Sequence, residues 1–171
     1  YGEESGKAVM NLIASGLRPR DIVTRDSLEN AAVVVAASGG STNAGLHLPA
    51  IAHEAGIKFD LEDVCDIFKK TPYIADLKPG GRYVSKDVYD IGGVPVLLKA
   101  LLDGGYLKGD CITVTGRTMS ETLADVEFPT DQDVIKPTSD PLSPTGGVVG
   151  LKGSLAPQGA IVKVAGMTNT K

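Results

Sequence analysis

Apolar residues recur at helical spacing over most of the first 126 residues. Residues 28–37 predict a helix, and its alanine- and valine-rich body over residues 31–37 is apolar on every side, which predicts burial on most of its surface. Thr24 or Asp26 can cap this helix, and Asp60 can cap a helix that begins at Leu61. Further helices are predicted over residues 3–15, 41–55, 61–70, 85–91, 94–103 and 119–126.

Segments typical of strands lie between and after these helices. They cover residues 73–77, 111–115, 146–150 and 160–164. Four of the ten prolines fall between Phe128 and Thr145, where apolar residues are few. This composition predicts a linker or long surface connection over residues 129–145. We therefore expect an α/β unit over residues 1–128 and the beginning of a β-rich unit over residues 146–171.

The most distinctive local pattern separates the buried helix from the next one. Gly39 and Gly40 interrupt the helical pattern, and a Ser-Thr-Asn cluster restarts it with good N-cap chemistry. Backbone N–H groups at a helix start favour anions. Gly40, Ser41, Thr42 and Asn43 are therefore the candidate binding residues. The simpler alternative is a polar cap between two buried helices.

Composition and charge narrow the class of protein. The 171 residues are 42% hydrophobic and 22% charged with a net charge of −4, which is ordinary for a soluble globular protein and argues against a nucleic-acid partner. No run of 18 apolar residues predicts a membrane span. Cys65 and Cys111 make no disulfide framework, as expected in a reducing cytosol, and Cys65 is expected to pack in a core.

Five blocks in order along the chain resemble the dihydroxy-acid and sugar-acid dehydratase family. Two of them are Thr24-Arg25-Asp26-Ser27-Leu28-Glu29-Asn30-Ala31 and Gly39-Gly40-Ser41-Thr42-Asn43 running into Leu46-His47-Leu48-Pro49-Ala50-Ile51-Ala52. The others are Ala75-Asp76-Leu77-Lys78-Pro79-Gly80-Gly81-Arg82-Tyr83, Gly109-Asp110-Cys111 with Thr113-Val114-Thr115-Gly116, and Gly159-Ala160-Ile161-Val162-Lys163-Val164-Ala165-Gly166. Together they cover nearly the whole chain.

The resemblance implies a fold and an activity. The fold would be part of a three-layer α/β/α N-terminal domain, followed by a linker and the first strands of a β-barrel-like C-terminal domain. The activity would be dehydration of 2,3-dihydroxy-3-methylbutanoate, or its methylpentanoate analogue, to the 2-oxo acid in valine and isoleucine biosynthesis. The family uses a [2Fe–2S] or [4Fe–4S] cluster as Lewis acid, Mg²⁺ to hold the substrate, and a serine alkoxide as base. Its members are expected to be dimers or tetramers, cytoplasmic in bacteria and organellar in eukaryotes.

Several family motifs do not occur in this sequence. The three cluster cysteines, the Cys-Asp-Lys motif and the Arg-Phe-Ser-Gly motif of the catalytic serine are all missing. We therefore expect an internal piece of a dehydratase that has no catalytic or metal-binding residue and is inactive alone. A sugar-acid or 6-phosphogluconate dehydratase of the same family is one alternative. A non-catalytic binding or assembly module is another.

Overall fold

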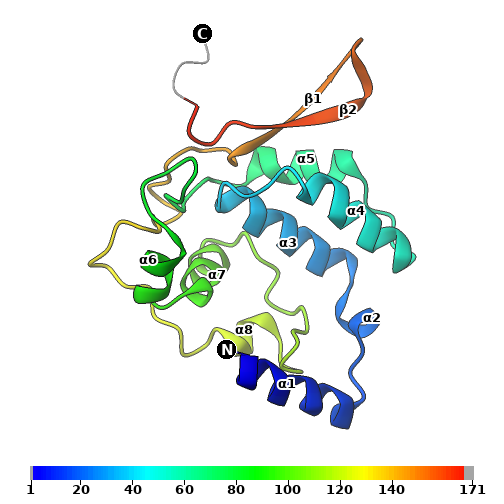
Figure 1. The fold of residues 1–171 in the computed structure, drawn as a ribbon, viewed down its shortest axis with the longest axis vertical. Coiled ribbons are helices and arrows are strands. Elements are labelled where there is room, and N and C mark those ends of the chain that lie inside the picture. The colour runs from blue at the N-terminus through cyan, green and yellow to red at the C-terminus, as the bar shows by residue number, and fades with distance from the viewer. Residues whose placement is uncertain (1, 168–171) are drawn as a thin grey trace.

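The computed structural model of the chain describes residues 2–167, which form helices and one β-hairpin (Figure 1). The helices are α1 (Gly2–Ser15), α2 (Pro19–Ile22), α3 (Arg25–Ala37), α4 (Ala44–Glu54), α5 (Leu61–Lys70), α6 (Ser85–Asp90), α7 (Val94–Asp103) and α8 (Met119–Thr122). The strands are β1 (Val148–Gly153) and β2 (Ala156–Lys163). This mixture is compatible with the expected α/β class. The last four residues of the expected β-rich unit lie outside the described residues.

Helix α3 lies at the centre of the packing and serves two cores. Ala32 and Ala36 face one core and Ala37 faces the other, and all three side chains are fully buried. The Thr24 side chain accepts the Ser27 N–H at 3.1 Å, and the Ser27 hydroxyl accepts the Thr24 N–H at 2.8 Å. The predicted burial of this helix and its capping by Thr24 are confirmed.

The first core joins α3, α4, α5 and the start of the hairpin. Its buried members are Leu28, Ala32, Ala36, Ala52, Phe59, Val64, Phe68 and Val148. Asp60 caps α5 as predicted, because its carboxylate accepts the N–H groups of Glu62 and Asp63. The hairpin lies over α5 (Figure 1), so Val148 covers an apolar surface that α5 would otherwise expose.

The second core joins the other face of α3 to α7 and to two extended segments. Its buried members are Val33, Ala37, Ile74, Ala75, Val96, Leu97, Ala100, Leu101, Leu107, Val134 and Ile135. Helix α7 has the predicted bounds, with Pro95 in its first turn and Gly104 at its end. Helix α1 lies apart from both cores (Figure 1), and none of its residues is buried.

Residues 73–77 are extended, but they do not form a regular strand. Isolated bridges join Tyr73 to Ser143, Ala75 to Ile135 and Leu77 to Tyr83. The three partners belong to different segments of the chain, so no continuous ladder develops. The predicted strand was therefore wrong as a regular element, although two of its N–H groups, those of Ile74 and Ala75, still reach one acceptor, the Ala37 carbonyl.

The predicted strand over residues 111–115 was also wrong. Ile112 makes a single bridge to Thr118, and the Thr113 N–H donates to the Arg117 carbonyl at 2.8 Å. The chain reverses at Gly116, whose φ of +77° suits a tight turn, before a second pair can form.

The bounds of α6 and α8 also differ from the sequence prediction. Helix α8 ends at Thr122 rather than residue 126, although its predicted capping box from Thr118 and Glu121 is present. Helix α6 begins at Ser85 itself, with Val84 in the cap position, and ends at Asp90.

Within the described residues, no helix is long and apolar enough to cross a membrane.

The predicted strands of the C-terminal part pair as an antiparallel hairpin. Val148 pairs with Lys163 and Gly150 with Ile161, and the register shifts between Leu151 and Gly153. Both segments contain β-branched residues, which explains why the sequence predicted them as strands.

The proline-rich connection before the hairpin is packed against the second core in part. Val134 and Ile135 are buried. The Gln132 side chain accepts both of their N–H groups at 2.9 Å and donates to the Ile135 carbonyl at 2.8 Å. The domain limits at residues 128 and 145 stay a prediction.

Candidate functional site

The candidate binding residues lie on the loop between α3 and α4. Helix α3 ends at Ala37, and Gly39 then takes a left-handed φ of +63°. The Gly39 N–H donates to the Ala36 carbonyl at 3.2 Å, and the Gly40 N–H donates to the Val35 carbonyl at 2.9 Å. The glycines therefore end the helix as the sequence predicted, and they aim the chain into α4.

Helix α4 begins three residues later than predicted, at Ala44. Asn43 occupies the cap position, but its backbone is helical (φ −58°, ψ −24°) and its side chain caps no N–H group. The Ser41 hydroxyl instead accepts the Asn43 N–H at 3.2 Å, and the Ser41 carbonyl accepts the Ala44 N–H at 3.2 Å. An N-cap side chain reaches the helix from an extended backbone. The turn at Ser41 removes that geometry at Asn43, so within the predicted Ser-Thr-Asn cluster it is Ser41, and not Asn43, whose side chain accepts an N–H group near the helix start.

This arrangement leaves several donors available to a ligand. Among the described residues, the N–H groups of Ser41 and Thr42 and the side chains of Thr42 and Asn43 have no intramolecular hydrogen-bond partner. Ser41 and Asn43 are exposed, and Thr42 is half-buried. The start of α4 carries partial positive charge, because the peptide dipoles of the helix are aligned. Carboxylate and hydroxyl oxygens are therefore the groups that this loop can bind.

Tyr73 and Ala165 lie directly behind Gly39 of the loop. A Cβ atom placed on Gly39 would lie 2.6 Å from the ring of Tyr73 and 3.2 Å from the Cβ of Ala165. Burial, and secondarily the charge of Asp76, raises the pKa of the Tyr73 phenol above its usual value. Tyr73 therefore stays neutral and acts as a packing surface under the loop. No local sequence pattern marks Tyr73 or Ala165 as a neighbour of the loop.

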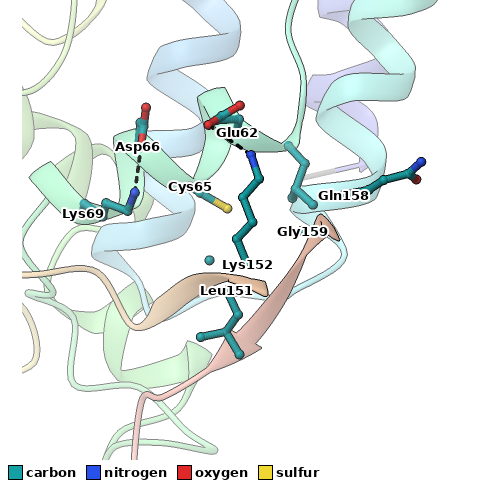
Figure 2. A pocket seen from close by; sticks show the side chains of 10 residues that line it. Glu62, Cys65, Asp66, Lys69, Leu151, Lys152, Gln158 and Gly159 are labelled. Atoms are coloured by element: carbon teal, nitrogen blue, oxygen red, sulfur yellow. Dashed lines mark hydrogen bonds and ion pairs between the residues drawn. The ribbon is translucent and has the colours of Figure 1, made fainter. Parts of the chain in front are cut away.

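Cys65 lies at a small surface pocket of about 100 Å³ between α5 and the hairpin. Figure 2 shows its side chain directed from α5 towards the hairpin, beside an ion pair between Lys152 and Glu62. Cys65 is only partly buried, so the expectation that it packs in a core was wrong. Val64 and Phe68 fill the core instead, and the hairpin covers Cys65 incompletely.

The two cysteines do not come together as ligands of one iron–sulfur cluster, because Cys65 and Cys111 line different pockets. Burial also raises the pKa of both thiols, which disfavours the thiolate form that binds a cluster. Cys111 faces a separate hollow beside Asp26 and Lys108. Within residues 2–167, no group of three or more His, Cys, Asp or Glu side chains could hold a metal ion. The described residues therefore fit neither a cluster nor Mg²⁺, and we derive no step through either.

His47 lies on α4 but does not belong to the candidate loop. It is exposed and lines an apolar groove of about 410 Å³ between α2 and α4. The Arg20 guanidinium donates to the Glu54 carbonyl at 2.5 Å at the edge of this groove.

Comparison with known families identifies the group to which this chain belongs. Residues 1–122 match the model described as dihydroxy-acid/6-phosphogluconate dehydratase N-terminal, and residues 133–171 match the corresponding C-terminal model. The chain belongs to the dihydroxy-acid/6-phosphogluconate dehydratase family. The resemblance carried by the five sequence blocks is confirmed.

Over the aligned region, more than half of the residues of this chain are identical to those of individual relatives in this dehydratase family. The dihydroxy-acid dehydratase of Parvibaculum lavamentivorans is 71% identical over 167 residues, which are 98% of this chain and 29% of that protein. Dihydroxy-acid dehydratase 2 of Bradyrhizobium diazoefficiens is 69% identical over the same shares of both chains. The dihydroxy-acid dehydratase of Sulfolobus acidocaldarius is 51% identical over 173 residues, 100% of this chain and 31% of that protein. The chain thus spans about 29% of the length of the first two of these relatives.

Proposed function

We propose that the protein containing this chain is a dihydroxy-acid dehydratase of valine and isoleucine biosynthesis. Its substrates would be 2,3-dihydroxy-3-methylbutanoate and the methylpentanoate analogue. The observation that carries the proposal is the 71% identity, over 98% of this chain, to a protein named dihydroxy-acid dehydratase. A 6-phosphogluconate dehydratase is the alternative within the family, and the names of the three relatives above favour the first function.

The proposed reaction is an elimination of water. The C2 proton is removed, the electrons of the C2–H bond form the C2=C3 double bond, and the 3-hydroxyl leaves with the C3–O electron pair and a proton as water. The enol then transfers its hydroxyl proton to solvent and gains a proton at C3, which gives the 2-oxo acid. No net oxidation or reduction occurs.

The proposal includes features of the whole enzyme. These are a three-layer α/β/α domain, a β-barrel-like C-terminal domain, a [2Fe–2S] or [4Fe–4S] cluster with Mg²⁺, a dimeric or tetrameric assembly and a cytoplasmic location. Family membership supports them. The groups that hold the cluster and the metal would come from outside the described residues, because those residues offer no fitting ligand set.

Within this enzyme, residues 40–43 would bind oxygen atoms of the dihydroxy acid. The support is local. Within the part of the chain that the structure describes, the N–H groups of Ser41 and Thr42 and the side chains of Thr42 and Asn43 have no partner, and the positive end of α4 lies behind them. A bound carboxylate or hydroxyl would satisfy donors that have no partner within residues 2–167. Their role would be to orient the substrate, and the C2 proton would pass to a base elsewhere.

The Thr42→Val substitution in the full-length protein tests this role. Valine keeps the shape of the side chain and removes only the hydroxyl. We expect kcat/KM for 2,3-dihydroxy-3-methylbutanoate to fall about 10-fold or more, because a hydrogen bond to a charged group contributes about 1.5–3 kcal/mol. The matched control is Thr145→Val, an exposed threonine before the hairpin, which should keep wild-type constants. Unchanged kcat and KM in Thr42→Val would remove the loop from the site. Preference for 6-phosphogluconate over the dihydroxy acid would replace the proposed function by its alternative.

A further inference from the structure

The candidate loop is attached to the C-terminal part of the chain through backbone atoms. The Ala36 carbonyl, in the last turn of α3, accepts the N–H groups of both Gly39 and Gly147 at 3.2 Å. The Gly147 carbonyl in turn accepts the N–H groups of Val164 at 2.9 Å and Ala165 at 3.0 Å. One continuous hydrogen-bonded path therefore runs from the end of β2 through Gly147 to the start of the loop.

This attachment has no room for a further side-chain atom. A Cβ on Gly147 would lie 2.7 Å from the Gly39 Cα and 2.8 Å from the Ala165 Cβ. Gly80 also packs closely against Ala165. A Cβ placed on Gly80 would lie 2.9 Å from the carbonyl carbon of Ala165. We call Gly39, Gly80, Gly147, Ala165 and Gly166 the glycine junction. Close-packed backbone of this kind transmits a displacement instead of absorbing it.

The glycine junction is next to the residues proposed to bind substrate. Gly39 directly precedes Gly40, the first of those residues, and it is buried. Beyond Gly40, the N–H groups of Ser41 and Thr42 have no partner among the described residues. The place of the loop is therefore set by the end of α3 and by the contact with Gly147 and Ala165.

We propose that Gly147 is a positioning residue for the loop of residues 40–43, so that the segment matched by the C-terminal family model sets where the donors of the N-terminal segment lie. Its kinetic consequence rests on the proposed function. Misplacement of binding groups by about 1 Å can lower the rate about 100-fold. A methyl group on Gly147 would require a shift of a few tenths of an ångström or more, because Cβ contacts below 3.0 Å do not persist.

The test compares two glycines of the hairpin region in the full-length enzyme. Gly147→Ala adds a methyl group into the glycine junction, and its φ is not in the left-handed region, so the change tests space alone. Gly153→Ala adds the same group at the end of β1, where nothing lies within 4 Å. Amide hydrogen exchange of residues 40–46 and the separate values of kcat and KM are measured for both. The double variant Gly147→Ala/Ala165→Gly removes the contact at 2.8 Å.

For Gly147→Ala we expect at least about 10-fold faster exchange, within residues 40–46, at the hydrogen-bonded amides of Gly40 and residues 43–46, and kcat/KM lowered about 10- to 100-fold. Gly153→Ala should change neither quantity, and the double variant should recover part of both. The proposal is overturned if Gly147→Ala and Gly153→Ala have the same amide exchange rates at residues 40–46 and the same kcat and KM. A uniform rise in exchange over the whole protein, with no recovery in the double variant, also overturns it. If Thr42→Val is silent while Gly147→Ala still loosens residues 40–46, the positioning stands and the proposed binding role of the loop fails.

Discussion

Arg25 and Asp63 form a bidentate ion pair between the first turns of α3 and α5. Two guanidinium nitrogens of Arg25 lie 2.7 and 3.1 Å from the two carboxylate oxygens of Asp63. The same guanidinium lies 4.9 Å from the centre of the Phe59 ring and donates to Glu29 at 2.7 Å. Paired hydrogen bonds of this geometry fix orientation as well as distance. The pair therefore sets how the two helices that carry the first core meet.

The Asp63→Asn substitution should make the stability of the folded protein less dependent on pH in the acidic range. The hydrogen bonds from Arg25 hold the pKa of Asp63 below its usual 3.8. A lowered folded pKa contributes stability that is present above the unfolded value of about 4 and is lost as pH falls through the folded value. Because Arg25 is 41% exposed, screening limits the effect of Asp63→Asn to about 1 kcal/mol.

The measurement for Asp63→Asn is the melting temperature between pH 3 and pH 7. We expect a loss of about 2–4 °C at pH 7 that shrinks below pH 4. Asp125→Asn, an exposed position, is the control and should change little at either pH. A loss that grows on acidification would contradict the assignment of the ion pair.

Asn30 should be a sensitive polar position. Its amide donates to the Lys108 carbonyl at 3.0 Å and accepts the Lys108 N–H at 2.8 Å, and the side chain is buried. Asn30→Leu leaves two backbone groups without partners, which should cost about 2 kcal/mol. Urea denaturation measures the cost, and amide exchange at Lys108 should accelerate. The exposed Asn11→Leu is the control. Equal stability of the two variants would show that solvent replaces the Asn30 contacts.

Phe68 should dominate the first core. Its side chain is 1% exposed and packs in the cluster that joins α3, α5 and β1. Phe68→Ala should lower the free energy of unfolding by about 3–5 kcal/mol. Leu46→Ala, at a side chain that is 67% exposed, should cost less than about 0.5 kcal/mol. A small loss in Phe68→Ala would mean that the hairpin collapses into the space.

The two thiols should react slowly at neutral pH. Burial raises the pKa of Cys65 and Cys111 above 9.0, so the reactive thiolate is scarce below that pH. The rate of iodoacetamide labelling, followed by mass, should keep rising beyond pH 9. Single Cys65→Ser and Cys111→Ser variants separate the two signals, and the denatured chain gives the reference rate. Reference-rate labelling of the folded protein at pH 7 would exclude the raised pKa values.

The elements that the sequence predicted well are those specified by neighbouring residues. The bounds of α7 follow from Pro95 and Gly104, and the start of α5 follows from the capping side chain of Asp60. The segments at Tyr73 and Ile112 were predicted as strands from local sequence, by alternation in the case of residues 111–115. Whether such a segment joins a ladder depends on partners far away in the chain, which alternation does not encode.

The candidate site shows the same division. The glycines before Ser41 mark the end of α3 from local sequence, and that prediction was correct. The capping chemistry predicted for the Ser-Thr-Asn cluster comes from Ser41 and not from Asn43, because a turn at Ser41 takes up the N–H groups of Asn43 and Ala44. The contact between Gly39 and Gly147 joins positions more than 100 residues apart, and adjacent glycines at 146 and 147 were its only trace in the sequence.

The hydrogen bond from Gly147 to Ala36 also has a consequence for synthesis on the ribosome. The two residues are separated by about 110 positions, so at roughly 5–20 residues per second the acceptor emerges about 5–20 s before its donor. During that interval Val148 has not yet been made, and the apolar surface of α5 that it covers is open to water. A nascent chain that pauses before residue 146 therefore exposes the apolar face of α5. Synthesis of the hairpin then allows Val148 to cover that face.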